Sequence, residues 1–167
     1  MALASLSKGK VSYVLRSLLY TAVVMSATVP ACAQSETDIV SLNEFNAKNS
    51  DAMATDPPTL QYVAIRCSAL YVALAKALDG ETAPDRVKLM NNLLDKSTNS
   101  FGTAVNIERR SPTKNTDANI KDISKKVQTL AYIYVDKMKD ARLRMGSFWE
   151  DKIVSGDYKI CEAIMKR

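Results

Sequence analysis

The sequence predicts an all-α protein, a single-domain helical bundle of about four helices with a short N-terminal helix and one disulfide. Three long segments carry apolar residues at intervals of three or four, which is the period of an amphipathic helix. No segment shows the alternation of Val, Ile or Thr that is typical of a strand. After residue 33 the chain contains two cysteines, Cys67 and Cys161.

Residues 1–33 have the layout of a secretory signal peptide that is cleaved. Three basic residues and no acid precede an apolar run at 18–29. This run is shorter than the roughly 20 apolar residues that a membrane-spanning helix needs. The tripeptide ACA at 31–33 fits the small-residue rule for signal peptidase, so we expect the mature chain to begin at Gln34.

The segment VPAC at 29–32 leaves a lipoprotein alternative open, in which Cys32 is lipidated and becomes the first mature residue. Pro30 fits such a motif poorly, so export to the bacterial periplasm or secretion is favoured over a lipid anchor. Three of the 23 basic residues and none of the 18 acids lie in 1–33, which leaves a net charge of +2. We therefore expect no nucleic-acid partner, and no membrane contact unless Cys32 is lipidated.

The rest of the chain is predicted to divide into a short N-terminal helix with a linker at 34–58 and the helical bundle at 59–167. The linker is expected to end at the double proline, 57–58. The first bundle helix is predicted from Thr59 to about Asp79, with apolar residues around most of its circumference, so it should pack on more than one face. Its core stripe consists of Leu60, Val63, Ala64, Cys67, Leu70, Tyr71, Leu74 and Leu78.

The second bundle helix is predicted from Pro84 to about Arg110, because proline is favoured in a first turn and Ser111-Pro112 would end the helix. Polar residues interrupt its stripe, which consists of Val87, Met90, Leu94, Phe101 and Val105.

The third bundle helix has the strongest periodic signal and begins at Thr116 or Asp117. Its apolar positions continue to Phe148, with a kink expected at Gly146-Ser147. We further expect Ser155-Gly156 to close the next helix and Asp157 to cap a short last helix. That last helix carries Ile160, Cys161, Ile164 and Met165.

In an oxidising compartment two cysteines of one small domain most simply form a disulfide, here Cys67 with Cys161, although two separate buried thiols are the alternative. Arg66 lies about 100° around its helix from the core stripe, so its guanidinium should be outward or paired. Asp157 and Glu162 flank Cys161 and are the carboxylates expected to pair with Arg66 across the bridged helices.

We expect no catalytic residue, no metal site and no cofactor, and therefore no enzyme. The chain has no histidine, which excludes histidine-dependent triads and the commonest metal ligand. A carboxylate-based hydrolase is the surviving enzymatic alternative, with Asp136 and Asp140 one helical turn apart. Basic residues surround these acids, as is typical of a solvated helix face.

The sequence predicts a protein that acts by binding another protein in the cell envelope, as an inhibitor, immunity protein or adaptor. Its architecture resembles that of small exported helical immunity and inhibitor proteins, but this likeness carries no residues across. The loop SPTKNTD at 111–117 and the exposed side around Trp149 are candidate contact surfaces. The alternative is a small-molecule carrier, whose interhelical pocket would be lined by Tyr71, Tyr134, Asn91, Ser97 and Thr98.

Overall fold

The computed structural model describes residues 39–110 and 116–165, with side chains except at 53, 54 and 116. The predicted signal peptide, Cys32 and most of the SPTKNTD segment lie outside these residues. The described residues form α1 (Leu42–Lys48), α2 (Ala52–Thr55), α3 (Pro57–Ala77), α4 (Pro84–Arg109), α5 (Thr116–Met145), the 3-10 turn η1 (Phe148–Glu150) and α6 (Lys152–Met165). They contain no strand, which confirms the all-α prediction. None of these helices combines the length and apolar character that crossing a bilayer requires.

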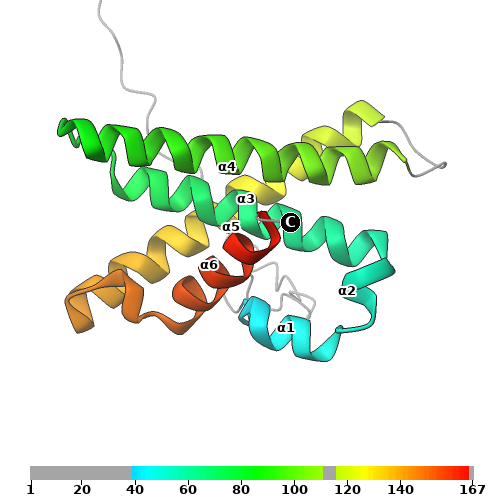
Figure 1. Ribbon diagram of the computed structural model, residues 1–167, viewed down its shortest axis with the longest axis horizontal. Coiled ribbons are helices and arrows are strands. Elements are labelled where there is room, and N and C mark those ends of the chain that lie inside the picture. The colour runs from blue at the N-terminus through cyan, green and yellow to red at the C-terminus, as the bar shows by residue number, and fades with distance from the viewer. Residues whose placement is uncertain (1–38, 111–115, 166–167) are drawn as a thin grey trace, which may run out of the picture. The chain divides into compact units, whose positions relative to one another are not determined.

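The helix α3 is the central element of the bundle. It runs beside α4, with α5 crossing the pair and α6 packed against α3 (Figure 1). Every residue from Val63 to Tyr71 is buried, whichever side of the helix it occupies. The small residues Ala69 and Ala73 are completely buried and let neighbouring helices approach closely. The expectation that this helix packs on more than one face is confirmed.

The helix α3 begins two residues earlier than expected, so the double proline belongs to the helix and not to the linker. Pro57 and Pro58 occupy the first turn, where a missing N–H costs no intrahelical hydrogen bond. Asp56 is the N-cap, and its carboxylate accepts hydrogen bonds from the Thr59 N–H at 2.9 Å and the Thr59 hydroxyl at 2.5 Å. The expected linker itself contains the short helix α2.

The buried face of α4 differs from the predicted stripe. Leu93 is buried, whereas Leu94 is 42% exposed, so the assignment of Leu94 to the core was wrong. The face that meets α3 includes Ser97 and Ser100, both buried. Apolar periodicity failed here because small polar side chains, which let α3 and α4 approach closely, occupy core positions.

The helix α5 buries Ile123, Tyr134, Met138 and Ala141, as its period predicts. It ends at Met145, so the expected kink at Gly146-Ser147 was wrong. Gly146 has a φ of +80°, and its N–H donates to the Arg142 carbonyl at 3.0 Å. This left-handed conformation favours glycine and terminates the helix.

The helix α6 continues through Ser155-Gly156-Asp157, so the predicted break there was wrong. The carboxylate of Asp151 begins the helix by accepting the N–H groups of Ile153 and Val154, both at 2.9 Å. A Cβ on Gly156 would lie 3.3 Å from the Asn43 side chain. Gly156 therefore lies at a close contact with α1 inside the helix and does not form a turn.

The predicted disulfide joins Cys67 of α3 to Cys161 of α6, with their Cα atoms 5.5 Å apart. Both cysteines are buried in the main hydrophobic core. The bridge therefore fastens the last helix to the central one.

Reduction of this disulfide is expected to lower the melting temperature by about 10 °C or more. The bridge spans a sequence separation of 94 residues. On the chain-entropy model, closing a loop of about 100 residues stabilises a protein by about 4.7 kcal/mol, and each kcal/mol moves the melting temperature by at least about 2 °C. Circular dichroism melts with and without reductant test this. Coincident melts, with complete reduction shown by thiol titration, would contradict a structural role.

Candidate functional site

The side chain of Arg66 is completely buried on α3, where it contacts side chains of α5 and α6 and the chain just before α1. Its Nη2 donates to the Asp157 carboxylate of α6, forming an ion pair in which both side chains are inaccessible to solvent. Its Nε donates to the Tyr134 hydroxyl of α5 at 2.9 Å. Its Nη1 donates to the Val40 carbonyl at 2.9 Å and to the Tyr62 hydroxyl at 3.0 Å. Every nitrogen of the guanidinium is therefore hydrogen bonded.

The carboxylate of Asp157 completes this cluster and links it to α1. Its Oδ2 accepts from Arg66 and from the Tyr134 hydroxyl. Its Oδ1 accepts the N–H of Leu42, the first residue of α1, at 2.5 Å. Asp157 was expected to cap the last helix. It instead accepts the N–H of Leu42, 115 residues away in the sequence, which has no partner within its own helix because it belongs to the first turn of α1.

The surroundings of Arg66 and Tyr134 fix the protonation states of these two side chains. Burial acts to lower the pKa of Arg66, but interaction with Tyr134 and Asp157 outweighs it and raises this pKa above its already high usual value. Burial, the largest effect, raises the pKa of Tyr134 well above its usual range, although the Arg66 charge acts in the opposite direction. Arg66 therefore stays charged and Tyr134 stays a neutral donor. With Arg66, Tyr134 and Asp157 all buried and bonded to one another, the cluster joins α3, α5 and α6.

Glu162, the other carboxylate named as a partner for Arg66, forms a second attachment of α6. Its Oε1 accepts from the Tyr71 hydroxyl of α3 at 3.0 Å and from Lys96 Nζ of α4 at 2.5 Å. Burial, followed by the hydrogen bond to Glu162, raises the pKa of Tyr71 above its usual value. The structure thus brings Arg66 to Asp157 and places Glu162 beside Tyr71 and Lys96.

The polar pocket expected between the helices is not formed by the residues named for it. Asn91 and Thr98 are exposed on α4. Ser97 is buried, but its hydroxyl lies 3.0 Å from that of Ser68 and joins α4 to α3. Tyr71 and Tyr134 are completely buried core residues with bonded hydroxyls.

The acids proposed for hydrolase chemistry lie on the surface of α5. Asp136 pairs with Lys139 at 3.8 Å, and Asp140 pairs with Arg144 at 2.6 Å, all with exposed side chains. Among the described residues, no three side chains of the metal-binding types come together. This arrangement matches the solvated helix face described from the sequence.

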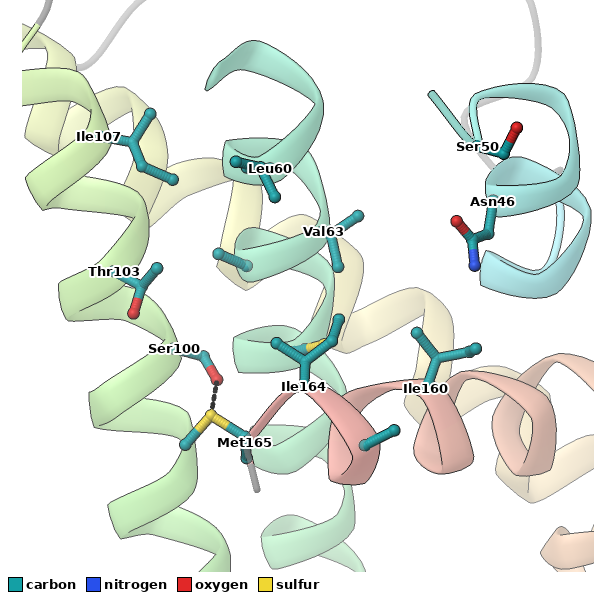
Figure 2. Close-up of a pocket in the computed structure, with 13 residues that line it drawn as sticks. Asn46, Ser50, Leu60, Val63, Ser100, Thr103, Ile107, Ile160, Ile164 and Met165 are labelled. Carbon is teal, nitrogen blue, oxygen red and sulfur yellow. Dashed lines mark hydrogen bonds between the residues drawn. The ribbon is translucent and has the colours of Figure 1, made fainter. Parts of the chain in front are cut away.

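A hollow of about 520 Å³, here called the interhelical groove, is a candidate binding site formed by described residues. Figure 2 shows α3 at its centre, with α4 and the α1 segment on either side and α6 crossing in front. It is lined by Asn46, Ser50, Leu60, Val63, Ala64, Cys67, Ser100, Thr103, Ile107, Ile160, Ala163, Ile164 and Met165.

The chemistry of the interhelical groove is apolar and uncharged. Aliphatic side chains make up most of its lining, and its polar groups are amide and hydroxyl groups carried by α1, by α4 and by Ser50, two residues after α1. Leu60 and Ile164 are 37% and 42% exposed, so the groove presents large apolar side chains to solvent. Its volume lies within the range of about 300–1,000 Å³ that is usual for ligand sites. Such a surface suits an apolar occupant and offers nothing to pair with a charge.

Sequence reasoning missed this groove because the helical period identifies apolar faces but not how completely neighbours cover them. Leu60 was placed on the core stripe and is partly exposed instead. The sequence did contain one indication of the groove. The last helix carries a wide apolar face, with Ile160 and Ile164 one turn apart.

Asp157→Asn is expected to lower the free energy of unfolding by about 3–5 kcal/mol, because it leaves the Arg66 charge buried without an anionic partner. The amide keeps an acceptor for the Leu42 N–H. Asp140→Asn is the matched control, since it removes an exposed ion pair and should cost less than about 1 kcal/mol. Urea denaturation measures both variants, and equal losses would contradict an organising role for Asp157.

Comparison of the sequence with protein-family models and curated proteins, and of the structure with solved structures, finds no match. The described residues form two candidate sites. One is the buried polar cluster around Arg66, and the other is the open apolar groove, whose lining includes the next residue, Cys67.

Proposed function

We propose that this protein is exported and acts by binding another protein of the cell envelope, as an inhibitor, immunity protein or adaptor. The interhelical groove is the surface proposed to receive the partner. Its occupant is an uncharged apolar segment of that partner, such as the apolar face of a helix laid into the groove.

The observation that carries this proposal is the uncharged lining of a wide, solvent-exposed hollow. None of the described residues that line the groove is acidic or basic, so a charged group entering this part of it would lose hydration without gaining a partner there. An apolar segment would instead cover Leu60 and Ile164, whose exposure to water is unfavourable in the isolated chain. Hydroxyl and amide groups of Ser50 and Asn46 lie along one side, where polar edges of a bound segment would find hydrogen-bonding groups.

The small-molecule carrier is retained as the second candidate, because the groove volume suits a ligand as well as a peptide segment. A carrier was expected to have a pocket lined by tyrosines and polar side chains, whereas the lining of the groove is mostly aliphatic. A carrier of this construction would therefore take an uncharged apolar compound. The hydrolase gains no support from the exposed ion pairs of Asp136 and Asp140.

Export is part of the proposal and rests on the signal-like layout of residues 1–33. A buried disulfide is also in keeping with an oxidising compartment.

Photo-crosslinking in cells that produce the full chain tests the proposal. A benzophenone amino acid at position 60 or 164 is expected to give the same discrete adduct, because both residues line the groove. Position 94 is the matched control, since Leu94 is as exposed as Ile164 but does not line the groove. The crosslinked partner is then identified and purified.

The purified partner is expected to bind Ile164→Asp at least about tenfold more weakly than the unaltered protein, because a carboxylate would enter an apolar contact. Leu94→Asp should leave its affinity unchanged. Adducts formed equally well from position 94, or none from positions 60 and 164, would refute the groove as the partner site. A co-purifying apolar compound in place of a protein adduct would favour the carrier.

A further inference from the structure

A second, smaller hollow of about 250 Å³ lies between α3, α5 and η1, and we call it the basic hollow. It shares no lining residue with the interhelical groove. Its lining divides into two chemical kinds. Five residues are apolar and three are cationic: Ala73, Ala77, Val135, Met138 and Phe148, with Lys76, Lys139 and Arg142.

The apolar residues form a true floor, because Ala73 and Met138 are buried and belong to the main core. The cationic residues, by contrast, are exposed on the last turns of α3 and α5 and the turn before. Charged heads on long side chains therefore surround a water-accessible apolar depression. None of the described residues that line it is acidic.

The three cations differ in the partners they already have. Lys76 pairs with Asp79, and Lys139 pairs with Asp136 at 3.8 Å. No ion pair of Arg142 is found within 39–110 and 116–165. Arg142 is therefore the cation best able to take an incoming anion, and its planar guanidinium suits a carboxylate.

Two exposed residues extend this surface along α5. Tyr132, Lys139 and Leu143 are spaced by seven and four residues, which places them on one line of the helix. Tyr132 and Leu143 are 67% and 86% exposed. An aromatic ring and an aliphatic side chain thus lie on either side of a rim cation, where they would extend contact with an apolar chain.

We propose that the basic hollow binds a single-chain amphiphile with an anionic head, a medium- or long-chain carboxylate. The alkyl chain would lie on the floor formed by Val135, Met138 and Phe148. The carboxylate would meet Arg142 at the rim. This inference goes beyond the proposed protein-binding function and does not depend on it.

Titration with decanoate below its micellar concentration tests the site. Trp149 is the only tryptophan of the chain, and its ring centroid lies 4.8 Å from that of Phe148. A saturable change in its fluorescence is therefore expected with decanoate. Butyrate, which has the same head and little chain, should give no response over the same range. Decyltrimethylammonium, which has the same chain and the opposite charge, should bind at least about tenfold more weakly.

Matched variants locate the bound molecule. Arg142→Gln is expected to weaken decanoate binding about fivefold, the effect of losing one exposed ion pair. Arg144→Gln removes the same charge two residues away and should have no effect, because Arg144 pairs with Asp140 and does not line the hollow. Ala77→Phe should abolish binding by filling the hollow, and Ile164→Asp in the interhelical groove should not change it.

Several outcomes would overturn the proposal. Absence of a saturable decanoate response would mean that the cations only stabilise the C-terminal ends of α3 and α5, where the helix dipole is negative. An equal response to decyltrimethylammonium would show that the anionic head does not contribute to binding. Loss of binding in Ile164→Asp but not in Ala77→Phe would move the ligand to the groove. Arg142-dependent sedimentation with phosphatidylglycerol vesicles, without a decanoate response, would assign the surface to a bilayer.

Discussion

The buried ion pair between Arg66 and Asp157 is the interaction on which the arrangement of the helices depends. Burying two charges costs several kcal/mol per ion, and the attraction between them offsets this cost only when the remaining donors and acceptors are satisfied. Here Tyr134 of α5 and the Leu42 N–H of α1 supply those partners. No buried side-chain polar atom of the described residues lacks a hydrogen-bond partner. The cluster is complete only when α1, α3, α5 and α6 are all in place, so it selects one arrangement of four helices.

The contacts that hold α6 against α3 also form the surface proposed to bind a partner. Asp157 and Cys161 lie one turn apart on α6, and both hold that helix against α3. Ile160 and Ile164, on the next turns, then form one wall of the interhelical groove. The α1 segment is held through Leu42 and contributes another wall, including Asn46, on the side of α3 away from α4. The buried contacts of Asp157 therefore position the apolar side chains of the groove, which are left partly exposed to solvent.

The sequence predicted much of this fold because helix periods and caps are local properties. The long helices, the disulfide and Asp157 as one of two carboxylates near Arg66 all followed from spacing or from proximity to Cys161. The role of Asp157 toward α1 was not predictable, because it depends on a contact between residues 115 positions apart. The prediction for Gly156 was wrong for the same reason, since a glycine at a close helix–helix contact looks in sequence like one that ends a helix. The two hollows escaped prediction because they arise where helices diverge, which no single helical pattern records.

Native-state hydrogen exchange of the unaltered protein and the Asp157→Asn variant tests most directly whether this carboxylate organises α1 and α6 around α3. If it does, the variant loses protection in both α1 and α6, including the Leu42 and Ile160 amides, while the central turns of α3 and α4 stay protected longest. Loss confined to α1, or an equal loss in every helix, would contradict the claim that one buried ion pair fixes both walls of the groove.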